Sequence, residues 1–78
     1  LTKKFTAEGI NAEIVLENGI VKKVSINGSE IAVTASALNS YEGLSNDFIV
    51  EIKTENSEIS SFKVTGMLDG VETVLNPE

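Results

Sequence analysis

The sequence predicts a mostly β domain, a small antiparallel sandwich or barrel of six to seven short strands within residues 1–78. Apolar and polar residues alternate with a period of two along most of the chain, as in half-buried strands. Turn dipeptides such as Asn-Gly and Asp-Gly separate these runs. Short strands with turn signals at regular spacing are typical of sandwiches and barrels. The length predicts one domain rather than two.

The N-terminal third predicts an edge segment followed by a hairpin. Residues 2–7 form a first extended run that ends near Glu8-Gly9, and residues 11–17 form a clear alternating strand. Asn18-Gly19 predicts the first hairpin turn, because both residues tolerate positive φ. Residues 20–26 then return alongside the preceding strand. The inward positions of this hairpin are Ala12, Ile14, Leu16, Val24 and Ile26.

The middle of the chain has the least regular pattern. Asn27-Gly28 predicts a turn, and residues 30–35 alternate again and are rich in β-branched residues, which favours a strand. Residues 36–46 break the alternation and are expected to form a short turn-like helix, or else a long loop. An α+β fold with one helix near 29–43 is the alternative, because several apolar residues there have roughly helical spacing.

The C-terminal third returns to strands. Residues 48–54 and 59–65 alternate, Asp69-Gly70 predicts a two-residue hairpin turn, and the run 71–75 closes the chain. The core predicted from all these strands is Ile14, Leu16, Val24, Ile26, Val33, Phe48, Val50, Ile52, Phe62 and Val64.

A faint internal repeat accompanies these strands. A shift of 38 residues without gaps places Glu13-Ile14 on Glu51-Ile52 and Glu17-Asn18 on Glu55-Asn56. The two copies correspond to residues 12–36 and 50–74, each with three strands. Two interpretations remain open: any two β-hairpins resemble each other, or a duplicated three-stranded unit packs as two layers.

The chain contains no His, Cys, Arg or Trp. These residue types supply most imidazole acid–base catalysis, thiolate chemistry, zinc ligation and bidentate phosphate binding. Glu13 and Glu51 are the candidates for paired-carboxylate chemistry, but both occupy outward strand positions where a solvated role is expected. Asn46-Asp47 and Asp69 with Glu72 are weak candidates for calcium, because turn chemistry explains them without a metal. We therefore expect no enzymatic activity and no cofactor.

The charge balance bears on possible partners. Twelve acids against six lysines give a formal charge of −6, which argues against nucleic acid as a partner. No apolar run approaches the roughly 20 residues that a membrane-spanning helix needs, so no membrane partner is expected. The expected partner is therefore another protein, or a second copy of this chain in self-assembly.

Two surfaces are candidates for such a contact. Leu38, Tyr41 and Leu44 lie in the one irregular segment, and binding residues concentrate in loops. Lys3 and Lys4 mark the run 2–7 as an edge strand, because lysines commonly protect sheet edges. The expected function is a non-enzymatic protein-binding or assembly module. The alternative is a small acidic regulator or inhibitor that blocks a basic or nucleic-acid-binding site of a partner protein.

Overall fold

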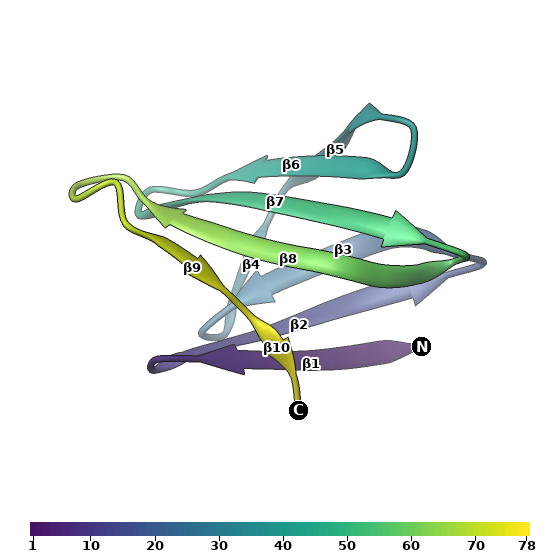
Figure 1. The fold of residues 1–78 in the computed structure, drawn as a ribbon, viewed down its shortest axis with the longest axis horizontal. Helices are drawn as coiled ribbons and strands as arrows, with labels where there is room; N and C mark the ends of the chain where they lie inside the picture. Colours follow the sequence, from purple (N-terminus) through teal and green to yellow (C-terminus); the bar gives the residue numbers. More distant parts are fainter.

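Two antiparallel sheets of five strands each make up the fold, and a computed structural model describes it over all 78 residues (Figure 1). Strands account for 72% of the residues, and there is no helix. The mostly β fold predicted from the alternating pattern is therefore confirmed, and the alternative helix near 29–43 is wrong.

The first sheet has the strand order β10-β1-β2-β3-β4. Four of its strands are consecutive in the chain, and the fifth comes from the C-terminus. The bounds are β1 Thr2–Ala7, β2 Ile10–Glu17, β3 Ile20–Ile26, β4 Ser29–Ile31 and β10 Asn76–Pro77.

The second sheet has the strand order β5-β6-β7-β8-β9, again with every neighbouring pair antiparallel. The bounds are β5 Val33–Ala37, β6 Ser40–Leu44, β7 Phe48–Glu55, β8 Glu58–Gly66 and β9 Glu72–Val74. The total of ten strands exceeds the six to seven expected from the sequence. The additional strands are short: β4, β9 and β10 contain three residues or fewer.

The chain passes from one sheet to the other twice. Ala32 separates β4 from β5, and Leu75 separates β9 from β10, so a single residue links strands of different sheets at each crossing. Figure 1 shows the second crossing, where the chain leaves β8 through β9 and reaches β1 as β10. Each sheet therefore receives one edge strand from the other half of the chain.

Most of the tight turns depend on residues with positive φ. Asn18 and Gly19 have φ values of 54° and 76°, and they join β2 to β3 as predicted. Both central residues of a type I′ turn need positive φ, which explains the preference for Asn-Gly there. An earlier turn at Glu8-Gly9 has the same character, so Asn18-Gly19 forms the second hairpin of the chain rather than the first.

The prediction for residues 36–46 is wrong, because these residues form neither a helix nor a long loop. They contribute to a hairpin of β5 and β6 that turns at Leu38-Asn39, with Asn39 at φ 61°. Tyr41 faces inward in β6, and Gly43 is buried two residues later. β6 pairs with β5 on one side and with β7 on the other. This pairing satisfies the backbone hydrogen-bonding groups of β6, although its sequence shows little alternation of apolar and polar residues.

The predicted two-residue turn at Asp69-Gly70 is also wrong. β8 continues to Gly66 and β9 begins at Glu72, so the connection is the longer loop Met67–Val71. The Val71 N–H donates to the Asp69 Oδ1 atom at 3.0 Å, a local bond that Asp makes readily in turns. The Asp-Gly pair therefore stabilises part of a loop instead of forming the whole turn.

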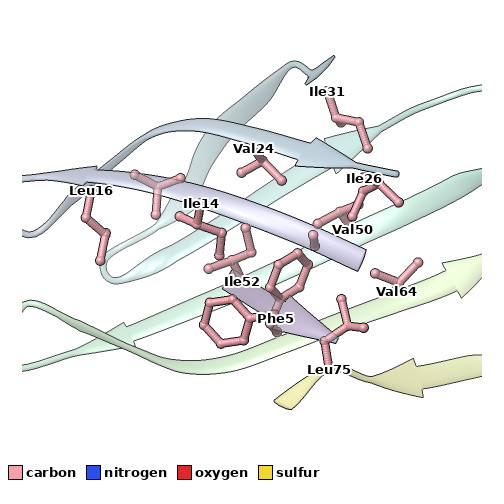
Figure 2. Close-up of a cluster of buried hydrophobic side chains, with 13 residues drawn as sticks. Phe5, Ile14, Leu16, Val24, Ile26, Ile31, Val50, Ile52, Val64 and Leu75 are labelled. Atoms are coloured by element: carbon pink, nitrogen blue, oxygen red, sulfur yellow. The ribbon is translucent and has the colours of Figure 1, made fainter. Parts of the chain in front are cut away.

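Thirteen buried apolar residues form one core between the sheets (Figure 2). Eight of the ten predicted core residues are buried, whereas Val33 and Phe48 are only partly buried. The core also contains side chains outside the predicted set, namely Phe5, Ala12, Val21, Ile31 and Leu75. Ile31 directly precedes the crossing residue Ala32, and Leu75 is itself the second crossing residue. The burial of both side chains therefore depends on where the chain changes sheets.

The two halves of the chain have the same strand register. Phe5 lies opposite Ala12 in the first sheet, and Gly43 lies opposite Val50 in the second, at a shift of 38 residues. The same shift relates every other pair of β1–β2 and β2–β3, except Ala7 with Ile10, to a pair of β6–β7 or β7–β8. Even the register irregularity after Val15 recurs after Lys53. β1, β2 and β3 thus correspond to β6, β7 and β8.

The correspondence continues through the crossings, but with a longer connection in the second half. Two residues separate Ile26 from its register partner Ser29, whereas eight separate Val64 from its partner Thr73. Beyond this difference, β4 and β5 correspond to β9 and β10. The loop Met67–Val71 lies within the additional residues, so it has no counterpart in the first half.

Gly43 lies where the first crossing passes close to β6. A Cβ atom at this position would lie 3.0 Å from the Ala32 carbonyl oxygen and 2.6 Å from Val33 Cγ1. Overpacking of this kind costs about 1–3 kcal/mol, so we expect Gly43→Ala to lower the free energy of unfolding by that amount. Urea denaturation measures it. Gly28→Ala is the comparison variant without a steric clash, because a Cβ atom added there would have no other atom within 4 Å. Only the φ of +86° at Gly28 disfavours alanine. Equal stability of G43A and wild type would contradict the close approach.

Candidate functional site

Leu38, Tyr41 and Leu44 do not share one surface. Leu38 lies at the tip of the β5–β6 hairpin and is 91% exposed. Tyr41 faces inward and packs against the core, whereas Leu44 lies at the far end of β6 and is exposed. Leu38 and Leu44 are therefore the two exposed members of this set, and they lie at opposite ends of the same hairpin.

Lys3 and Lys4 lie in β1 and are exposed, on opposite faces of the strand. β1 is not the outermost strand of its sheet, because β10 pairs with it at Phe5 and Thr6. The expected edge is therefore covered over its C-terminal part, while Thr2 and Lys3 have no register partner in β10.

The candidate carboxylates do not converge. Glu13 lies opposite Lys4 in the first sheet, and Glu51 lies between Glu42 and Lys63 in the second. No group of three or more carboxylates has an arrangement that would hold a metal ion. No segment forms a helix able to cross a lipid bilayer.

Exposed aliphatic side chains gather at one end of the second sheet. Leu44 and Ile49 lie opposite each other on its outer face, with exposed fractions of 64% and 40%. Val74 in β9 also faces outward and is exposed. The Met67 N–H donates to the Asp47 carbonyl at 2.9 Å, which holds the following loop against the β6–β7 turn. We call this the aliphatic surface, and its members are Leu44, Ile49, Met67, Leu68, Val71 and Val74.

The other half of the molecule provides an internal comparison for this surface. At the positions that correspond to Leu44, Ile49 and Val74, the first sheet has Thr6, Asn11 and Glu30. The loop residues Met67, Leu68 and Val71 belong to the connection that is longer in the second half. Corresponding backbone positions thus carry polar side chains in the first sheet and aliphatic side chains in the second.

Carboxylates surround the aliphatic surface. Asp47 lies in the β6–β7 turn, Asp69 in the Met67–Val71 loop and Glu72 at the start of β9, and all three are exposed. The one lysine nearby, Lys63, pairs with Glu72 at 3.5 Å between Nζ and Oε2. The surface therefore has an acidic border, and Thr65 and Lys63 of β8 lie between Ile49 and Val74 on the outer face.

Of the residues proposed from sequence, Leu44 belongs to this surface, and the other five members were not identified. A signal for Ile49 was available, because it is apolar at a position where the alternation of β7 expects a polar residue. The loop residues carried no such signal, since exposed apolar residues in a loop have no periodicity.

No protein-family model matches the chain. Searches of curated proteins and of solved structures likewise found no significant match.

Proposed function

We propose that this chain is a non-enzymatic protein-binding module that contacts its partner through the aliphatic surface. The observation that supports this most is the contrast between the two halves: Leu44, Ile49 and Val74 replace polar residues at corresponding positions. Exposed apolar side chains that gather at one end of a sheet commonly mark interaction sites.

The acidic border favours a partner with an apolar patch flanked by lysine or arginine. Asp47, Asp69 and Glu72 would face basic groups across such an interface, and complementary charges favour the correct orientation. A second copy of this chain would instead bring acidic borders together, which opposes self-association. The proposed occupant is therefore a different protein.

The test exchanges the aliphatic residues for their counterparts in the other half. A double variant Leu44→Thr plus Ile49→Asn should reduce capture of the partner at least tenfold, because the centre of the contact becomes polar. Capture is measured by quantitative mass spectrometry on immobilised protein, and the partner's affinity by titration calorimetry. Leu38→Asn is the control, since it removes another exposed leucine, at the opposite end of the hairpin.

Three outcomes would contradict the proposal. Equal capture by wild type and the double variant would show that the aliphatic surface is not the contact. A wild-type dimer that the double variant abolishes would identify a second copy as the occupant. Association that weakens steeply with ionic strength, while the double variant binds normally, would favour the acidic regulator, because screening acts on charges and not on apolar contacts.

A further inference from the structure

Two Asn-Gly pairs form turns at the surface of this protein. Asn18-Gly19 joins β2 to β3, and Asn27-Gly28 joins β3 to β4. All four residues have positive φ, with values of 54° and 76° in the first pair and 49° and 86° in the second. Both asparagines are exposed. In sequence and in backbone conformation, the two pairs are therefore alike.

An asparagine that precedes a glycine can react with its own backbone. The glycine nitrogen attacks Cγ of the asparagine side chain, so an N–Cγ bond forms and the Cγ–Nδ2 bond breaks. The amide nitrogen leaves as ammonia and takes the proton of the glycine N–H, and a succinimide ring remains. Glycine favours this attack because it has no Cβ atom to hinder the approach. No oxidant, reductant or cofactor takes part.

The two asparagine side chains differ in their hydrogen bonds. The Asn27 Oδ1 atom accepts from the Asn11 N–H at 2.9 Å, and the Asn27 N–H donates to the Asn11 carbonyl at 2.7 Å. These bonds fix the backbone and the side chain of Asn27 against β2. The Asn18 side chain makes no hydrogen bond within the chain. Attack at Asn27 must first break its side-chain bond, and attack at Asn18 has no such cost.

From this difference we infer that Asn18 is a site of spontaneous deamidation in the folded protein and that the fold protects Asn27. Water opens the succinimide at one of its two carbonyl carbons. Addition at Cγ gives aspartate, and addition at the main-chain carbonyl gives isoaspartate, in which the backbone passes through Cβ and Cγ of residue 18. Either product adds one negative charge to the formal −6 of the chain. The site is separate from the aliphatic surface and does not depend on it.

The position of Asn18 in the fold gives the reaction a structural consequence. Isoaspartate lengthens the backbone by one atom in a turn whose geometry suits two ordinary residues. Gly19 also lies against the β7–β8 turn, because a Cβ atom added to it would be 2.7 Å from the Ser57 Oγ atom. Isoaspartate at position 18 therefore disturbs the β2–β3 turn and its contact with Ser57. Aspartate keeps the backbone length, and Asp-Gly suits a type I′ turn.

The β7–β8 turn provides an internal control for the attack itself. Asn56-Ser57 corresponds to Asn18-Gly19 and has φ values of 53° and 65°. The Asn56 side chain also makes no hydrogen bond within the chain. The Cβ atom of Ser57 hinders its backbone nitrogen, however, so Asn56 should react more slowly than Asn18 in the same backbone conformation.

The test measures the deamidated fraction at each site over time. The protein is incubated at mildly alkaline pH, which favours loss of the glycine N–H proton, and is then cleaved with trypsin at Lys22 and Lys23, between the two sites. Mass spectrometry of the fragments should show Asn18 reacting at least about threefold faster than Asn27, since one net hydrogen bond corresponds to a factor of about two to ten. In concentrated urea the two rates should become nearly equal, because only the fold distinguishes them.

Three outcomes would overturn the inference. Equal rates at Asn18 and Asn27 in the folded protein would show that the hydrogen bond to Asn11 gives no protection. A rate at Asn18 no faster than that at Asn56 would show that the glycine has no effect in this turn. Reaction of Asn18 in urea alone would show that the folded turn protects its own asparagine.

A second measurement tests the consequence for the turn. Protein with isoaspartate at position 18 is isolated by chromatography, and its melting temperature is compared with that of the variant Asn18→Asp, which has the aspartate product. We expect the isoaspartate form to melt at a lower temperature and Asn18→Asp to melt close to wild type. Equal melting temperatures of the isoaspartate form and Asn18→Asp would contradict the predicted disturbance of the β2–β3 turn.

Discussion

Replacement of Phe62 by alanine should lower the free energy of unfolding by about 3–5 kcal/mol. The ring is 1% exposed, and it lies in β8 opposite the fully buried Ile52. A domain of this size has a total stability of about 4–12 kcal/mol, so the variant should lose a large share of its stability and melt at a lower temperature. Urea denaturation followed by circular dichroism measures the change. A melting curve identical to that of wild type would show that the ring lies outside the core.

The contact between Phe62 and Phe5 joins the two sheets directly. Their ring centroids lie 5.3 Å apart at an interplanar angle of 64°, an edge-to-face arrangement. Such pairs contribute about 0.5–1.5 kcal/mol beyond their burial. A double-mutant cycle with Phe5→Leu and Phe62→Leu should reveal a coupling of this size, and strictly additive effects would contradict the ring contact.

Ile14→Ala and Ile52→Ala should each cost about 2–5 kcal/mol, and the two costs should be similar. These residues hold corresponding positions in β2 and β7, and both are 0% exposed. Figure 2 shows both side chains within the core between the sheets. Chemical denaturation of the two variants tests whether the two halves of the chain contribute equally to the stability of the core.

Ile49→Ala is the control for this pair, because it truncates an isoleucine on the outer face of the same strand as Ile52. We expect its effect on stability to remain within about 0.5 kcal/mol, as for most surface substitutions. A loss at Ile49 as large as that at Ile52 would contradict the assignment of inner and outer faces in β7.

Prediction from sequence succeeded where the signal is local. The alternation around Ile14 and around Ile52 placed both strands and their inner faces, since side-chain direction in a strand follows position alone. Asn18-Gly19 placed a turn, because few other residue pairs accept positive φ twice in succession. Both signals are properties of neighbouring residues and need no knowledge of the rest of the fold.

Prediction failed where pairing partners decide the structure. The segment 36–46 has weak alternation, and it forms strands because β7 offers a paired edge to β6 and β5 then adds to β6. The aliphatic surface was recognised only at Leu44, since Val74 and the Met67–Val71 loop reach the same end of the sheet through pairing that is remote in sequence.

The sequence by itself determined three things about this protein: that it is built from β strands, the positions of most of its tight turns, and most of the residues of its core. The tertiary structure alone decided that the chain changes sheets at Ala32 and at Leu75, which sends β5 and β10 to opposite layers. It therefore also decided that β10 pairs with β1 at Phe5 and Thr6 and extends the first sheet beyond β1. The physical reason is that a strand must pair its backbone N–H and C=O groups with the edge of a neighbouring strand. Packing contacts between residues distant in the chain determine which strand that neighbour is.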